Sequence, residues 1–241
     1  MIDYLHRKVH NLTHPVLGRI LMLHRVVEQR SEKPEQRELE VTPQFLEQTI
    51  TEHLKKGCRF VSIDEAVEIL QKNHLSSFNF QHSTFICLTF DDGYQDNYTL
   101  AYPLLKRLNV PFAIYVTTGF IDKTAQMWWY DKTDVMSWEQ IKDLSKDPLC
   151  TIGSHTVSHP KLSTLTKEDA RKEILDSKQR LEEMLGTPIN HFSYPHGDNK
   201  ESILKVVKEA GFTTGLKAWG GPIRKGDVRL IELPRIEFRQ P

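Results

Sequence analysis

Short apolar runs along the chain alternate with longer segments in which apolar residues recur every three or four positions. The runs at residues 20–23, 85–90 and 112–116 are short and continuous, which is typical of strands buried on both faces of a sheet. Further strands are predicted with similar spacing at residues 59–61, 149–153, 191–194, 212–216 and 228–231.

Helix start and stop signals lie between these runs. Thr42 followed by Pro43 places a capping hydroxyl directly before a proline at the first helical position. Thr166 and Gly186 bound the longest predicted helix, with a capping side chain at its start and a glycine after its end. Shorter helices are predicted to begin at Ser62, Tyr98 and Ser137, and another is predicted to end at Ala210.

Strands that alternate with helices indicate βα units around a parallel sheet. We therefore expect an α/β fold, a distorted and incomplete (β/α)7-type barrel, with residues 1–241 forming a single domain. Polar residues follow the ends of four predicted strands: His24, the pair Asp91 and Asp92, His155 and His196. The carboxyl ends of barrel strands meet at one mouth, where active sites lie, so these side chains are predicted to be neighbours.

Composition narrows the classes of partner. Lys plus Arg and Asp plus Glu both number 32, so the net charge is zero and provides no general attraction to nucleic acid or to an anionic membrane. No apolar run is long enough to span a bilayer, and residues 1–14 lack the apolar centre of a signal peptide, so a cytoplasmic protein is expected. The three cysteines are far apart, which argues against a disulfide framework and against a cysteine-ligated zinc site.

Two of the polar clusters have the chemistry of a catalytic metal site. Asp91 and Asp92 are adjacent, and neighbouring side chains on an extended chain point in opposite directions, so one carboxylate can bind a metal while the other acts as a base. The alternative is an Asp-Asp-Gly turn. His155 and His159 are four residues apart, so one helical turn would bring both rings to one face; the alternative is a pair of surface histidines in a loop. One carboxylate and two imidazoles together make a three-ligand set with positions open to water.

Three motifs carry a resemblance to a known family. Residues 89–94 (TFDDGY) and 154–160 (SHTVSHP) resemble the first two motifs of the polysaccharide deacetylase family, also called carbohydrate esterase family 4 or the chitooligosaccharide deacetylase homology domain. Residues 192–197 (FSYPHG) resemble a variant of its third motif. The similarity covers nearly the whole chain in the right order, because residues 20–26 resemble the first strand of many members and residues 208–216 resemble a late family segment.

The resemblance implies a metal-dependent hydrolase that removes N-acetyl groups from amino sugars of a polysaccharide or a glycan precursor. Asp92, His155 and His159 would hold one divalent metal ion, usually zinc, and Asp91 would be the base that takes a proton from the attacking water. The backbone N–H of His196 would help to hold the oxyanion that forms on the amide carbonyl.

Two departures from the family pattern leave roles open. Ser193 stands where the third motif normally begins with an arginine that orients the base, and no leucine-x-histidine of the fifth motif follows His196 to supply the acid. His24 and His196 are the candidates for the acid; the alternatives are a capped strand end for His24 and an exposed loop histidine for His196. Arg235, in the C-terminal segment 233–237, is a candidate for the missing positive charge.

Substrate contacts are expected from residues near these motifs. Trp128 and Trp129 lie in a long predicted loop, where their rings would stack on sugars or pack as a flap on the barrel. Tyr194 and Arg235 are further candidates for contact with the substrate. The expected partner is an amino-sugar glycan of capsule, O-antigen or exopolysaccharide type. The alternatives are an amidase acting on a small non-sugar amide and a catalytically degenerate module that binds glycans.

Overall fold

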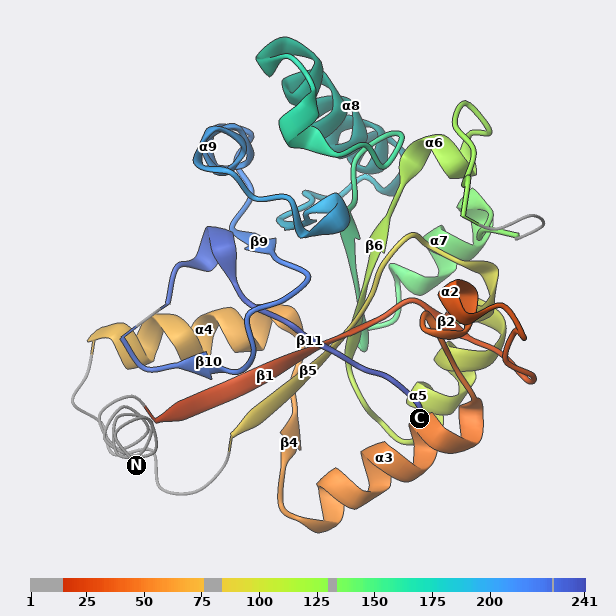
Figure 1. Cartoon of the computed structure of the whole chain (residues 1–241). Helices are drawn as coiled ribbons and strands as arrows, with labels where there is room; N and C mark the ends of the chain where they lie inside the picture. Colours follow the sequence, from red (N-terminus) through yellow and green to blue (C-terminus); the bar gives the residue numbers. More distant parts are fainter. Residues whose placement is uncertain (1–14, 76–83, 130–133, 227) are drawn as a thin grey trace.

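The computed structural model describes residues 15–75, 84–129, 134–226 and 228–241 (Figure 1). Residues 1–14, which entered the expectation of a cytoplasmic protein, lie outside this range. Within the described part of the chain, no helix combines the length and the apolar character that crossing a membrane requires.

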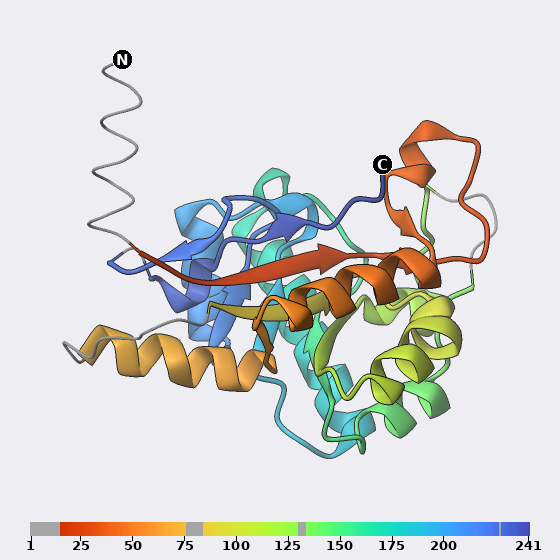
Figure 2. The same cartoon turned by 90° about the horizontal axis from the view of Figure 1, so that it is seen from below.

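A curled and mainly parallel sheet forms the centre of the molecule, which confirms the expected distorted barrel (Figures 1 and 2). The strand order is β10-β1-β5-β6-β7-β8-β9, with β4 beside β5 and β11 beside β1, while β2 and β3 form a separate pair. The bounds are β1 Val16–Leu23, β2 Arg25–Val26, β3 Glu40–Val41, β4 Arg59–Phe60, β5 Phe85–Phe90, β6 Phe112–Val116, β7 Cys150–Ser154, β8 His191–Ser193, β9 Thr214–Leu216, β10 Ile223–Arg224 and β11 Ile236–Glu237.

The C-terminal segment links the two sides of the curl. Leu216 at the end of β9 bridges to Leu233, and three residues later β11 pairs in parallel with β1. The prediction of a strand at residues 228–231 is wrong, because a 3₁₀ turn, η4 (Leu230–Glu232), lies there. This turn brings Leu233 against β9, so the extended pairing begins beyond it.

Helices cover the outside of the sheet (Figure 2). Their bounds are α2 Pro34–Arg37, α3 Pro43–Lys55, α4 Ile63–Leu75, α5 Tyr102–Arg107, α6 Thr118–Ile121, α7 Trp138–Leu144, α8 Lys167–Leu185 and α9 Glu201–Glu209, with short turns η1 Asn97–Ala101, η2 Leu162–Thr164 and η3 Pro195–Gly197. The predicted caps are present: Thr42 accepts from the N–H of Phe45, Thr166 accepts from the N–H of Asp169, and Gly186 ends α8 at φ 69°.

The helix predicted to begin at Tyr98 is two elements rather than one. A π-helical turn, η1, precedes α5, whose second residue is Pro103. Proline has no N–H to donate to the preceding turn, which favours the wider turn at this point. The π turn directs Asn97 towards the end of β1, where its amide donates to the carbonyl of His24 over 2.8 Å.

Apolar packing fills the sheet on both faces. Every residue of β5 and of β6 is buried, which explains why both strands read as continuous apolar runs rather than as alternating patterns. The rings of Phe85 and Tyr115 occupy the inner face, together with Ile20 and Cys87. The interior is therefore a packed core, and the open space lies at the carboxyl ends of the strands.

Candidate metal and catalytic centre

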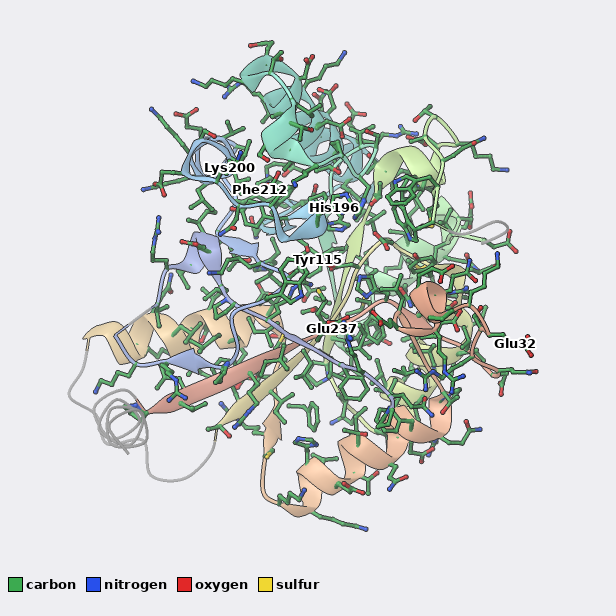
Figure 3. The ribbon with its side chains drawn as sticks, in the orientation of Figure 1. Glu32, Tyr115, His196, Lys200, Phe212 and Glu237 are labelled. Atoms are coloured by element: carbon green, nitrogen blue, oxygen red, sulfur yellow. The ribbon has the colours of Figure 1, made fainter. Side chains whose placement is uncertain are left out.

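A pocket of about 340 Å³ opens at the carboxyl ends of the strands. His196 and Glu237, both labelled in Figure 3, lie on its wall. The pocket brings together the sequence-predicted residues from strands far apart in the chain, as a barrel mouth does. These are His24, Asp91, Asp92, Trp128, Trp129, His155, His159, Tyr194, His196 and Arg235.

Asp92, His155 and His159 form the one tight metal-type cluster in the described part of the chain. Their ligand atoms all lie within 4.8 Å of one another. Asp92 Oδ1 is 3.6 Å from Nε2 of His155 and 3.5 Å from Nε2 of His159. Asp92 and His155 are 2% exposed. The three atoms thus face a common point from two different strand ends.

The loop that carries the two histidines is not the helical turn expected from their spacing. Thr156 and His159 have φ of 68° and 59°, in the left-handed region, which a right-handed helical turn does not contain. Glu173 of α8 stabilises this shape by accepting from the N–H groups of Val157 and Ser158, each over 2.9 Å. The rings still meet, with centroids 4.8 Å apart, because tertiary contacts rather than helix geometry set the loop.

The ring of His155 has a defined orientation. Its Nδ1 lies 2.8 Å from the carbonyl oxygen of Ser193 in β8, so this nitrogen is the donor and Nε2 is left to face Asp92. Burial lowers the pKa of His155 to about 4, against the raising effect of Asp91. Burial, together with the neighbouring His196, lowers the pKa of His159 to about 3. Both imidazoles are therefore neutral at physiological pH, which is the form that binds metals.

Asp91 has a different environment from Asp92. Burial by itself raises the pKa of Asp91, but the guanidinium of Arg235 reverses this and holds it well below its usual range. For Asp92, burial raises the pKa and the histidines His155 and His24 offset this only in part. The pKa is therefore lowered for Asp91 and raised for its neighbour Asp92, because only Asp91 is paired with a permanent cation.

Arg235 is buried and is committed to this pairing. It donates to Asp91 Oδ1 over 2.9 Å and to Oδ2 over 2.6 Å, a bidentate ion pair. Its other N–H groups reach Ser193 Oγ, Thr89 Oγ1 and the carbonyl of Lys217. All five guanidinium N–H groups are therefore used within the protein. Arg235 therefore lines the pocket without an N–H group left to donate to a substrate.

The two candidate acids differ in how firmly they are placed. The backbone of His24 is held by its carbonyl, which accepts from Asn97. The next two residues, which form β2, are held by Asp96: its carboxylate accepts from Arg25 Nε over 2.7 Å and from the N–H of Val26 over 3.1 Å. His24 is half-buried and lies in the pocket wall. His196 is exposed, at φ 56°, with its ring 4.6 Å from the ring of His159.

The aromatic residues predicted to contact the substrate differ in their exposure and their contacts. Trp129 donates from Nε1 to the hydroxyl of Tyr94 over 2.9 Å, and its ring lies 4.7 Å from the ring of His159. Trp128 is 79% exposed. The side chain of Tyr194 is buried, and its hydroxyl donates to the carbonyl of Ile231 over 2.8 Å. The hydroxyl of Tyr194 is therefore already used within the protein, although the residue lines the pocket as a candidate for substrate contact.

Comparison with known proteins is consistent with this geometry. The model of the family described as polysaccharide deacetylase matches residues 79–215, more than half of the chain. The chain belongs to the polysaccharide deacetylase family. The match spans both the carboxylate pair and the histidine loop, while Arg235 and the segment that closes the curl lie beyond it.

Several members of the family are similar to this chain. YxkH of Bacillus subtilis, whose name assigns it provisionally as a polysaccharide deacetylase, is 30% identical over 151 residues, covering 63% of this chain and 50% of its own. A poly-beta-1,6-N-acetyl-D-glucosamine N-deacetylase of Staphylococcus aureus is 25% identical over 138 residues, covering 54% of this chain and 46% of its own. The chain therefore spans about half the length of these relatives. The structure of the deacetylase PplD of Streptococcus pyogenes, in complex with acetate, superimposes with a TM-score of 0.79 at 25% identity, covering 93% of both chains.

Two residues that help to hold Asp91 and Arg235, Ser193 and Thr89, were not among the predicted site residues. Ser193 Oγ donates to Asp91 Oδ2 over 3.2 Å and accepts from Arg235, so the serine is part of the site that the family's arginine normally occupies. Thr89 Oγ1 accepts from Arg235 and donates to the carbonyl of Leu21. The sequence did contain a sign of their role, because Ser193 replaces the arginine of the family's third motif. A buried carboxylate that lacks this cation needs one from elsewhere in the chain.

Proposed function

We propose that this chain is a metal-dependent N-deacetylase acting on amino sugars of a glycan, with Asp92, His155 and His159 as the metal ligands and Asp91 as the base. The observation that carries the proposal is the division of labour between the two carboxylates. Asp92 faces two neutral imidazoles, while Asp91 is bound to a buried arginine. A metal ligand and a separate base are the two roles that hydrolysis of an amide by activated water requires.

The cluster fits a divalent cation. Asp92 Oδ1 is buried and accepts no hydrogen bond from the described residues, and the two imidazole nitrogens that face it lie 3.5 and 3.6 Å away. An uncompensated buried carboxylate is costly, and a bound cation would supply the missing positive charge. Two imidazole nitrogens and one carboxylate oxygen are a common set for catalytic zinc, so zinc is the proposed ion. A cation in such a site acts as a Lewis acid and makes water nucleophilic near neutral pH.

The side chains around the cluster provide the proton transfers. Asp91 accepts the proton of the attacking water, and Arg235 keeps it ionised and fixed in orientation. Arg235 thus takes the orienting role that the third-motif arginine has in other members. The low pKa that this pairing imposes makes Asp91 a weak base. Its contribution is therefore positional, since it receives a proton from water that is already activated.

His24 is the proposed acid for the leaving amine. It lies in the pocket wall, and the hydrogen bond from Asn97 to its carbonyl fixes its backbone. The backbone N–H of His196 is the proposed donor to the oxyanion, in a turn where the following N–H groups, those of Gly197 and Asp198, bond to Tyr194 and Pro195 carbonyls. The substrate is proposed to be a glycan of capsule, O-antigen or exopolysaccharide type, in line with the names of the similar proteins.

The test is acetate release from N-acetylglucosamine oligomers by metal-free protein and after zinc is added back. Asp92→Ala is expected to lose bound metal and activity together, with metal content measured by mass spectrometry. Asp91→Asn is expected to keep one equivalent of metal and to lose turnover.

His24→Gln should lose turnover with metal retained, and His196→Ala, which keeps the backbone N–H, is the matched control. Normal turnover by Asp91→Asn would refute the base. Metal and glycan binding without acetate release would instead identify a binding module.

A further inference from the structure

Exposed aromatic surface is concentrated at the pocket. Among the described residues, three large hydrophobic side chains are exposed: Trp128 at 79%, Trp219 at 61% and Leu54 at 43%. Both tryptophans line the pocket that holds the carboxylate and histidine cluster, whereas Leu54 lies on α3 away from it. Tryptophan is enriched at binding interfaces, so two exposed indole rings at one pocket indicate a surface that a ligand covers.

The topology places the two tryptophans on opposite rims. Around the mouth the strands follow the order β1, β5, β6, β7, β8, β9 and then the segment 233–237, which returns to β1. Trp128 comes from the connection after β6 and α6, and Trp219 comes directly after β9. These positions are three strands apart in a ring of seven, which is as far apart as the ring allows. In Figure 1, β9 and α6 lie on different sides of β6. The candidate catalytic cluster lies between them.

Hydrogen bonds hold the Trp219 loop at both of its ends. Lys217 donates from its N–H to Leu233, and its carbonyl accepts from Arg235 Nε over 2.7 Å. On the other side, Gly221 donates to the carbonyl of Arg235. The backbone on both sides of Trp219 is thus tied to the arginine that holds the base. A loop whose backbone is already held in this way loses little conformational entropy when a ligand stacks on its tryptophan.

Local sequence makes room for this ring. Gly197, at φ 64°, follows His196 in the third motif, and a Cβ there would lie 2.8 Å from the Ala218 Cβ and 3.2 Å from the ring of Trp219. The absence of a side chain at Gly197 therefore lets the loop close over the motif. Trp128 is supported differently, by an edge-to-face contact with Trp129 at 5.4 Å between ring centroids.

The geometry points to Trp128 and Trp219 as two sugar-stacking platforms of an extended site, so that the substrate is a linear glycan of several units that crosses the mouth. Arg239 pairs with both Glu237 and Glu38 in the pocket wall, which leaves one net negative charge in this group and suits an uncharged or weakly basic chain better than an anionic one. This inference rests on the proposed function and deepens it: deacetylation takes place on an internal sugar of a chain rather than on a single sugar carried by a nucleotide or a lipid.

The test compares N-acetylglucosamine oligomers of one to six units, in β-1,4- and β-1,6-linked series, with zinc-loaded protein. In the wild type, kcat/KM for acetate release is expected to rise with chain length. Trp219→Ala and Trp128→Ala should each lower kcat/KM for the longest oligomer roughly 3- to 10-fold, the range that one aromatic stacking contact supplies. Both variants should change the rate with the shortest substrate less than about twofold. Trp219→Phe should recover part of the loss, and Leu54→Ala is the control for removing an exposed hydrophobic residue elsewhere.

Binding separates this inference from the proposed function. Calorimetry with the Asp91→Asn variant measures oligomer affinity without turnover, and adding Trp219→Ala is expected to weaken hexamer binding by the same factor. If no acetate is released but this binding difference persists, the proposed deacetylase reaction is wrong, while the assignment of Trp128 and Trp219 as sugar-stacking platforms stands. The inference is overturned if the hexamer binds equally well with and without Trp219, or if no oligomer binds at all. It is also overturned if Trp219 governs binding only to phosphatidylglycerol vesicles, which would make these rings a membrane contact.

Discussion

The ion pair between Arg235 and Asp91 gives the most direct test of how this site is built. The carboxylate of Asp91 is 2% exposed and the arginine 1%, so neither charge is screened by water. In Arg235→Met the side chain keeps much of its apolar bulk, and Asp91 retains only the 3.2 Å bond from Ser193 Oγ among the contacts of this network. Removing one partner of a buried pair costs about 3–5 kcal/mol, compared with 0–1 kcal/mol for an exposed pair.

We therefore expect Arg235→Met to lower the free energy of unfolding by about 3–5 kcal/mol at pH 7, a large fraction of the roughly 5–15 kcal/mol that domains possess. Urea unfolding followed by tryptophan fluorescence and circular dichroism measures this, with a chelator present so that metal binding does not contribute. The double variant Arg235→Met/Asp91→Asn should be more stable than Arg235→Met alone, because the unpaired charge is gone.

The pH dependence of this difference has a defined sign. In the wild type, Arg235 holds the pKa of Asp91 below its unfolded value, so the stabilisation is present above about pH 4 and is lost as the pH falls further. In Arg235→Met the guanidinium no longer offsets the effect of burial, so the pKa of Asp91 rises and the folded variant takes up a proton more readily as the pH falls. The destabilisation should then be smaller at pH 5 than at pH 7. A loss of under about 1 kcal/mol, or a loss that is equal at both pH values, would contradict the reasoning.

Three further predictions concern the scaffold. Gly153→Ala should lower stability by roughly 1–3 kcal/mol or more in urea unfolding, because the new Cβ would lie 2.5 Å from the ring of Tyr115; an unchanged midpoint would refute this close packing. Thr166→Ala should cost about 1 kcal/mol through loss of the cap of α8, while the serine variant should retain most of it. Asp64→Asn should cost less than about 1 kcal/mol at pH 7, because the partner of His191 is 60% exposed; this difference should disappear as the pH falls through the lowered pKa of Asp64, and its persistence at acid pH would argue against the ion pair.

Local sequence patterns predicted the main strands, the helix caps and most of the candidate site residues. The apolar run of β5 followed at once by two carboxylates predicted a buried strand that ends in a site, and the caps at Thr42, Thr166 and Gly186 lie where their chemistry placed them. The two histidines were identified from spacing and from family resemblance. Such features depend on neighbours within a few residues, so the physical chemistry that produces them can be recognised in a linear sequence.

Only the tertiary structure decided which distant groups meet. Arg235 is 144 residues from the carboxylate that it holds, and its five hydrogen bonds exist only because the C-terminal segment links β9 to β1. The loop that carries His159 combines a local bond, from its N–H to Thr156 Oγ1, with distant bonds from Val157 and Ser158 to Glu173 of α8. Nothing in the sequence around Trp219 indicated a role in binding, because its proposed role depends on its position across the pocket mouth from Trp128. Contacts of this kind are fixed by chain closure and packing, which no short window of sequence contains.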